Sequence, residues 1–213
     1  VANQRLTLRL GPSLAAKWLT PRLSGFWARH PDVDLCLFHS TAAVDFDRED
    51  IDLAITYGRG SWPGVVSEHL LSLDYFPVCS PKLVGREPAT ADASLLLNQT
   101  LLHDSGYADW EDWLAEAGMP QINARRGLII DDTNVVIQAA LDGQGIALGS
   151  SLFVAEHLTS GRLVAPFDTR LYPDQAFYLV CPRSHLNRPL VQEFRDWLLA
   201  EASKLEFPAT LVG

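Results

Sequence analysis

Aromatic and cationic side chains follow an expected strand in the segment IDLAITYGRGSWPG, at residues 51–64. Tyr57 and Trp62 offer flat apolar surfaces, and the guanidinium of Arg59 can pair with a carboxylate through two parallel hydrogen bonds. Gly58 has no side chain, so a neighbouring group can approach its backbone closely. This combination favours a site for a small polar or anionic ligand, with Tyr57, Gly58 and Arg59 as candidate contacts.

Polar residues also stand directly after other expected strands. Ser13 is a suitable N-cap, and the backbone N–H groups that open its helix, including that of Leu14, favour an anion such as a carboxylate. Thr133 can cap a second helix and offer its hydroxyl, while Asp132 beside it can meet an amino group. His103 ends another strand and can donate or accept a hydrogen bond. These residues extend the candidate site towards an amino-acid-like ligand.

Each candidate contact has a structural alternative. Ser13 can be a simple N-cap, Arg59 a surface side chain, and His103 a histidine that bonds only to nearby backbone. Trp62 is expected to pack against its own loop rather than to cap a ligand. Ser150, after a further strand, is a weaker contributor to the expected ligand site.

No catalytic residues are expected. The sequence contains no G-x-S-x-G, H-E-x-x-H or P-loop pattern. A hydrolase built on Ser, His103 and Asp104 is disfavoured, because adjacent His and Asp cannot form the chain of contacts that a triad needs. Three scattered cysteines in apolar surroundings (Cys36, Cys79 and Cys181) argue against a disulfide framework or a zinc site. We therefore expect reduced thiols, no metal and no cofactor.

The composition describes an acidic chain with enough apolar residues for a sizeable core. It has 213 residues, 47% of them hydrophobic, and a formal net charge of −9. Such a chain lacks the clustered cations with which proteins hold the phosphate backbone of DNA. No apolar run approaches the ~20 residues that cross a membrane, and no secretory signal opens the chain. These observations favour a cytoplasmic protein that does not itself contact nucleic acid or membrane.

Alternating strands and helices predict an α/β fold. Residues 5–10 and 33–38 are expected strands on either side of a helix that begins at Ser13 and is divided by Pro21, which gives a parallel βαβ unit. Further strands are expected at residues 52–57, 65–71, 75–79, 101–103, 127–131, 145–149 and 176–181. Further helices are expected at residues 109–117, 133–142 and 150–158, with a last one capped by Asn187.

Six phrases occur in the order found in the effector-binding half of LysR-type transcription regulators, and the chain resembles that family over residues 5–200. They are LTLRLGPSLAAKWLTPRLSGFWARHPDVDL, IDLAITYGRGSWPG, YFPVCSPKL, LLHD, VVIQAALDGQGIAL and GRLVAPF. The GRGSWPG form is similar to the subgroup of glycine-cleavage activators and β-lactamase regulators.

The resemblance implies two Rossmann-like α/β lobes with a central cleft, as in type 2 periplasmic binding proteins. Lobe I would hold residues 1–76 and 163–213, and lobe II residues 77–162, with chain crossings near Phe76 and Arg162. The winged helix-turn-helix that precedes this domain in the family is not in the sequence. Fold alone does not fix function.

The resemblance also implies a function. The chain would bind a small carboxylate- or amino-acid-like effector between its lobes, and binding would change the geometry of a homodimer or homotetramer. DNA would be contacted only through the helix-turn-helix domain. The alternative is a solute-binding protein of a transport system with the same bilobal fold.

Overall fold

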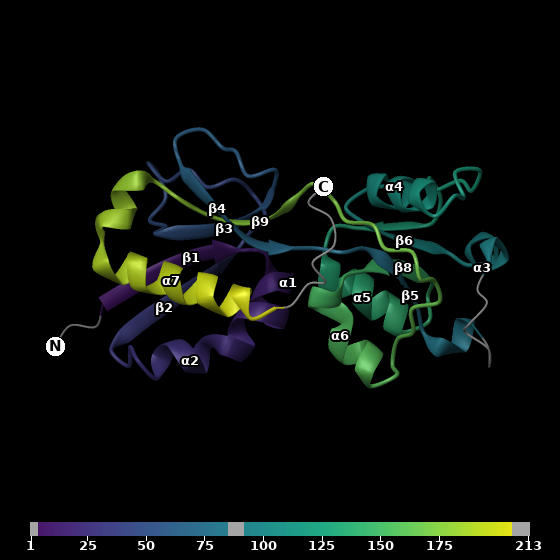
Figure 1. The fold of residues 1–213 in the computed structure, drawn as a ribbon, viewed down its shortest axis with the longest axis horizontal. Helices are drawn as coiled ribbons and strands as arrows, with labels where there is room; N and C mark the ends of the chain where they lie inside the picture. Colours follow the sequence, from purple (N-terminus) through teal and green to yellow (C-terminus); the bar gives the residue numbers. More distant parts are fainter. Residues whose placement is uncertain (1–3, 85–91, 206–213) are drawn as a thin grey trace. The chain divides into compact units, whose positions relative to one another are not determined.

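The computed structural model describes residues 4–84 and 92–205, and the chain divides into two compact units (Figure 1). Unit 1 comprises Val1–Ser72 and Asp174–Gly213, and unit 2 comprises Leu73–Pro173. Each unit contains one sheet with helices packed on it, so the mixed α/β class predicted from the sequence is confirmed. No helix in the described ranges is long and apolar enough to cross a membrane.

The sheet of unit 1 has five strands in the order β2-β1-β3-β9-β4. β1 pairs in parallel with β2 and β3, whereas β9 is antiparallel to both β3 and β4. Leu6, Leu8 and Leu10 of β1, an interior strand, are completely buried, as expected for a strand whose alternate residues face a helix layer. The strands are β1 Gln4–Leu10, β2 Val33–His39, β3 Leu53–Gly58, β4 Val66–Ser72 and β9 Ala176–Cys181.

The helical segment after β1 changes its hydrogen-bond pattern along its length. It consists of α1 Pro12–Leu14, a π-helical turn at Ala15–Leu19, a 3-10 turn at Thr20–Arg22 and α2 Leu23–Trp27. Pro21 has no N–H group and divides the helix as predicted. Ser13 as the N-cap is wrong: the cap position belongs to Gly11, because Pro12 is already suited to the first helical position.

The last helix, α7 Pro189–Ser203, packs against α2 in unit 1. The ring of Phe26 lies 5.0 Å from that of Phe194 and 5.5 Å from that of Trp197. Asn187 as the cap of this helix is wrong, because it belongs to a separate 3-10 turn at Arg183–Asn187. Arg188 occupies the cap position, with the extended backbone that a residue before proline prefers.

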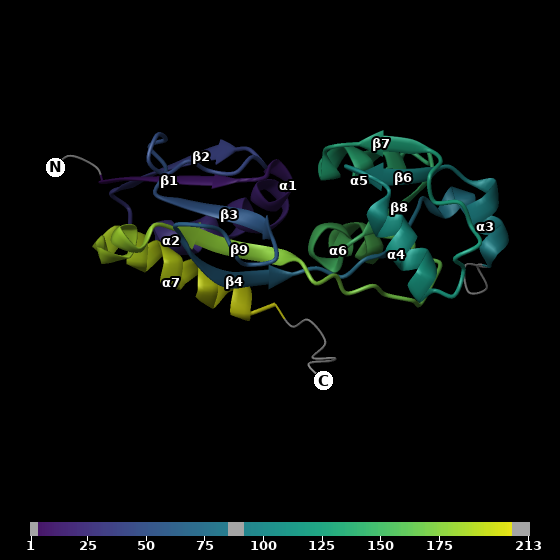
Figure 2. The same cartoon turned by 90° about the horizontal axis from the view of Figure 1, so that it is seen from above.

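The sheet of unit 2 has four strands in the order β5-β8-β6-β7, and β7 is one of its two edge strands (Figure 2). β6, β7 and β8 are parallel, and β5 is antiparallel to β8. The strands are β5 Phe76–Val78, β6 Leu101–Asp104, β7 Leu128–Ile130 and β8 Ile146–Gly149. The helices are a 3-10 turn at Pro81–Leu83, α3 Ala93–Asn98, α4 Ala108–Glu116, α5 Thr133–Leu141 and α6 Ser151–Thr159.

The boundaries of the two units differ from the expected crossings near Phe76 and Arg162. The returning chain stays in unit 2 until Pro173, because it pairs with the incoming chain and packs on the core of that unit. Tyr75 forms a bridge with Leu171, and Cys79 forms one with Val164. The division therefore falls at residues 72/73 and 173/174.

Candidate functional site

Five predicted contacts lie at one edge of the unit 1 sheet, the edge at which its parallel strands end. β1 and β3 are neighbouring parallel strands with Leu8 opposite Leu53, so their carboxyl ends reach the same edge. Ser13 and Leu14 follow β1, while Tyr57, Gly58 and Arg59 end or follow β3. In open α/β sheets, ligands bind at this edge.

The first turn of α1 offers backbone donors rather than side chains. The side chains of Ser13 and Leu14 are buried, and Pro12 has no N–H group. The N–H of Ala15 already donates to the carbonyl of Gly11 over 3.2 Å. The N–H groups of Ser13 and Leu14 are therefore the first-turn donors suited to an anion.

The loop after β3 is closed by aromatic packing. A side-chain carbon at Gly58 would come within 2.7 Å of the Trp62 ring, so glycine is what allows that ring to lie against the strand end. Trp62 also contacts Tyr178, with ring centroids 5.7 Å apart, in agreement with its expected packing role. The ring of Tyr57 lies 5.2 Å from that of Phe177. The ring of Tyr57, on β3, thus packs against a residue of the neighbouring strand β9.

Arg59 is the least constrained of these residues. Its side chain is 73% exposed and pairs over 3.3 Å with the equally exposed Asp174. Exposed pairs of this kind contribute about 0–1 kcal/mol, so Arg59 can exchange this carboxylate for that of a ligand.

Three parallel strands of unit 2 bring Asp104, Thr133 and Ser150 to one edge of its sheet. Asp104 ends β6, Thr133 begins α5 after β7, and Ser150 follows β8. The hydroxyl of Thr133 donates to the Asp104 carboxylate over 2.5 Å, which ties the end of β6 to the start of α5. Of the pair His103-Asp104 at this strand end, we predicted His103 as the contact, whereas Asp104 is the residue that bonds to Thr133.

Asp132, not Thr133, caps α5. Its carboxylate accepts hydrogen bonds from the N–H groups of Asn134 over 2.8 Å and Val135 over 3.2 Å. The predicted capping role of Thr133 is wrong, because Thr133 is the first residue of the helix and Asp132 occupies the cap position. The Thr133 hydroxyl is instead directed at Asp104.

His103 and Ser150 are both buried and engaged within unit 2. The Nε2–H of His103 donates to the carbonyl of Arg126 over 2.7 Å, and its ring lies 4.8 Å from that of Tyr107. The hydroxyl of Ser150 donates to Asp74 over 3.0 Å. Both side chains are therefore bonded inside unit 2, whereas Asp104 and Thr133 are more accessible polar groups at this edge of the sheet.

Carboxylates crowd this edge of unit 2 and shift one another's protonation. Burial raises the pKa of Asp104, with smaller contributions from the charges of Asp132 and Asp131, against hydrogen bonds from Thr133 and Ser105 that lower it. Burial also raises the pKa of Asp109 to about 6, and the charges of Asp104 and Asp112 add to this effect. The edge therefore favours a cationic group over an anion.

Replacing Asp109 with Asn is expected to stabilise the protein at neutral pH. The folded state binds the Asp109 proton more tightly than the unfolded state, so its contribution to stability is complete below about pH 4 and is lost as the pH rises through about 6. A pKa difference of two units corresponds to at most ~3 kcal/mol of unfolding free energy. Partial exposure of Asp109 reduces this figure, and so does its place in the first turn of α4, where the helix dipole stabilises a carboxylate. We therefore expect a gain of about 1 kcal/mol near pH 7.5.

Urea unfolding at several pH values measures this effect. The stability gain of Asp109→Asn should shrink towards zero near pH ~4. Glu116→Gln, an exposed change on the same helix, should leave the slope of stability between these pH values unaltered. Parallel pH curves for wild type and Asp109→Asn would contradict the assignment.

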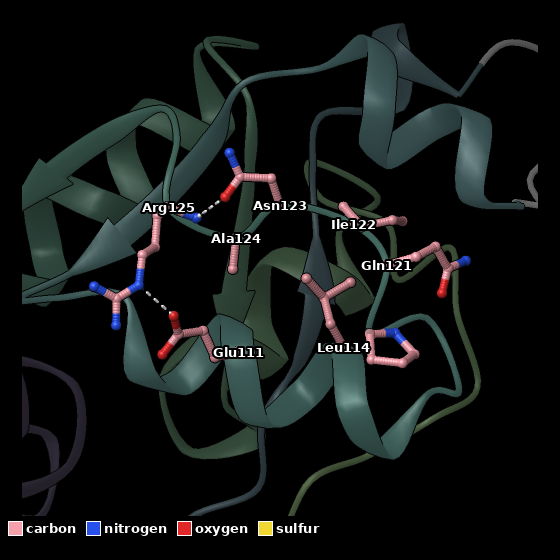
Figure 3. Close-up of a pocket in the computed structure, with 8 residues that line it drawn as sticks. Glu111, Leu114, Gln121, Ile122, Asn123, Ala124 and Arg125 are labelled. Atoms are coloured by element: carbon pink, nitrogen blue, oxygen red, sulfur yellow. Dashed lines mark hydrogen bonds and ion pairs between the residues drawn. The ribbon is translucent and has the colours of Figure 1, made fainter.

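A separate pocket of about 280 Å³ lies between α4 and residues 120–125 of unit 2 (Figure 3). Arg125 donates to Glu111 over 2.6 Å at its rim, and its backbone N–H donates to the side chain of Asn123. Leu114, Ile122 and Ala124 form the apolar part of the lining. None of the predicted effector contacts lines this pocket.

Thiols and metal-binding groups do not gather at either edge in the described part of the chain. Within residues 4–84 and 92–205, no three His, Cys, Asp or Glu side chains are arranged to hold a metal ion. Cys36, Cys79 and Cys181 are unpaired. Burial raises the pKa of both Cys79 and Cys181 to about 11, which makes these thiols weak nucleophiles.

Comparison with known proteins identifies similar sequences and folds. The family model described as "LysR substrate binding domain" matches residues 1–203. The glycine cleavage system transcriptional activator of Escherichia coli K12 is 39% identical over 202 residues, which is 95% of this chain and 66% of that protein. The transcriptional activator AmpR of Pseudomonas aeruginosa PAO1 is 31% identical over 199 residues, 93% of this chain and 66% of that protein.

Solved structures of related domains have a similar fold. The effector domain of AmpR from Pseudomonas aeruginosa has a TM-score of 0.84 and 30% identity, covering 94% of this chain and 96% of that one. The regulatory domain of CrgA from Neisseria meningitidis, at 18% identity and a TM-score of 0.77, shares the fold. The chain spans 66% of the length of the E. coli activator, so the whole of such a protein includes more than the matched part.

Proposed function

The chain belongs to the LysR substrate binding domain family, and from this premise we propose that it senses a small-molecule effector for a transcription regulator. The match over residues 1–203 is the observation that carries the proposal. The relatives are named as transcriptional activators, which favours regulation over the alternative of a transport solute-binding protein. The same names favour a regulatory role over catalysis. We propose a cytoplasmic location, because a regulator of transcription acts where the DNA is.

The effector we propose is amino-acid-like. The first-turn N–H groups of Ser13 and Leu14, with Tyr57 and Arg59 nearby on the same sheet edge, suit a carboxylate. The acidic edge of unit 2, around the Asp104–Thr133 pair, suits an ammonium group. We propose that Asp132, Gly58, His103 and Ser150 support these contacts, with His103 and Ser150 acting from behind the accessible groups.

The output we propose is a change in the assembly of a homodimer or homotetramer. An effector shifts such an equilibrium only by its difference in affinity for the two arrangements. Each unit offers an edge strand with exposed apolar side chains, β2 with Phe38 and β7 with Leu128 and Ile129. Pairing of unit 1 of one copy with unit 2 of another would cover both. DNA contact would be made outside this acidic chain.

Calorimetric titration of the purified chain with glycine tests the effector class. Acetate and methylamine carry only one of its two charged groups each, so each is expected to bind at least about tenfold more weakly than glycine. Thr133→Val removes the hydroxyl that donates a hydrogen bond to Asp104. It should weaken glycine binding by about tenfold, or ~1.4 kcal/mol.

Thr159→Val is the matched control. Its hydroxyl donates within α6 to the carbonyl of Ala155 and is exposed, so this variant should bind glycine like the wild type. No binding of glycine or of a panel of larger amino acids would refute the amino-acid class. Equal effects of the two threonine changes would refute the proposed place of Thr133.

A further inference from the structure

We propose that Asp74 is a positioning residue that fixes both connections between the units to the start of α6. Its carboxylate is 3% exposed and lies two residues into unit 2, on the incoming chain. Four donor groups from three residues surround it, and we define the Asp74 cluster as Asp74, Ser150, Ser151 and Arg170. The cluster lies wholly inside unit 2.

Both carboxylate oxygens of Asp74 are satisfied twice. One accepts from the Ser150 hydroxyl over 3.0 Å and from the Ser151 N–H over 2.8 Å. The other accepts from the Ser151 hydroxyl over 2.6 Å and from the guanidinium of Arg170. A buried carboxylate with this many donors is held in one place, because each lost bond would leave a charge uncompensated in the interior.

Arg170 brings the returning chain into the same cluster. It pairs with Asp74, donates to the Ser151 hydroxyl over 3.0 Å, and lies 4.1 Å from the centroid of the Phe76 ring. One residue further along each connection, Tyr75 and Leu171 exchange backbone hydrogen bonds of 2.7 and 2.8 Å. The incoming and returning chains are thus joined to each other and to α6.

The consequence concerns where the chain can bend. On this proposal, residues 74–76 and 170–171 belong to unit 2 as one body, and a change between the units is expected at the unit boundaries, 72/73 and 173/174. Ser150, expected from the sequence to contact an effector, acts here through Asp74 and orients the start of α6 instead. The regulatory meaning of this device rests on the proposed function, whereas the device itself can be measured without an effector.

Hydrogen exchange of the effector-free chain tests the proposal. In Asp74→Asn, the amides of Tyr75 and Leu171 should lose protection from exchange by about tenfold or more. The amide of Ile146, which lies in the sheet of unit 2 and donates to the carbonyl of Thr100, should keep its protection. Arg170→Ala should act in the same way, and Arg170→Lys should recover part of the protection because it keeps the charge. Ser151→Ala, which removes one donor, provides a milder variant if Asp74→Asn does not fold.

Arg125→Ala is the control, because it also removes an arginine–carboxylate pair of unit 2 but an exposed one. It should leave the Tyr75 and Leu171 amides unchanged. Loss of protection throughout unit 2 would show a merely structural role for Asp74, and unchanged protection at both connections would show no role; either result overturns the proposal. Failure of glycine to bind would count against the proposed function and leave this measurement intact.

Discussion

Gly127→Ala is expected to destabilise unit 2 by about 3 kcal/mol or more. Gly127 has φ +103°, a backbone conformation that side chains rarely adopt, and a Cβ there would stand 2.0 Å from the carbonyl oxygen of Leu101. The obstacle is the backbone of β6, which cannot move without disturbing its parallel pairing with β7. The same displacement would break the hydrogen bond from His103 to Arg126.

Gly118→Ala separates the clash from the backbone strain. Gly118 has φ +71°, but no atom lies within 4 Å of an added Cβ, so its replacement should cost only about 1 kcal/mol. Urea unfolding of both variants gives the comparison. Similar losses at the two positions would mean that the strand-to-strand approach at Gly127 is not a source of the effect.

The positions of most strands along the chain could be predicted from the sequence, because they show a clear local pattern. The apolar run at residues 176–181 predicts β9 over its observed range, Ala176–Cys181. The short α3, Ala93–Asn98, was not predicted, because three consecutive leucines show no helical period. Its one local signal is Asp92, whose carboxylate accepts the N–H of Ser94 over 2.8 Å. The family resemblance is confirmed by the match over residues 1–203.

Helix starts were harder to place, because neighbouring polar residues compete for the same cap. The sequence around the start of α5 offers both Asp132 and Thr133, and only the structure shows that the former caps while the latter reaches Asp104. At α1, Pro12 decides the start, and the serine after it lies inside the helix. One residue of error at such a corner exchanges a capping role for a hydrogen bond to the neighbouring strand.

The carboxyl ends of parallel strands could be predicted as the candidate site, but the burial of each side chain there could not. Ser150 bonds to Asp74, which lies 76 residues earlier in the chain. Arg126, which fixes His103, lies 23 residues after it. Such distant partners leave no trace in the local pattern around a strand end. Local pattern therefore identifies the edge of a sheet, and packing decides which of its residues face a ligand.

Ile129→Asp is expected to weaken self-association of the chain by about 100-fold, or ~2.7 kcal/mol. Ile129 lies on β7, the edge strand of unit 2, and is 44% exposed beside Leu128 and close in sequence to the exposed Val135 of α5. An apolar edge strand of this kind pairs readily with another chain. A carboxylate there would be buried without a partner on association, which opposes binding strongly.

Leu97→Asp is the matched control, because Leu97 is 58% exposed in the same unit but lies on α3 rather than on the edge strand. Sedimentation equilibrium should give a dissociation constant for Leu97→Asp within about threefold of the wild type, since it lies outside the expected interface. Phe38→Asp on β2 should match Ile129→Asp if unit 1 of one copy meets unit 2 of the other. Loss of association on changing only one of the two edge strands would instead indicate that like units pair.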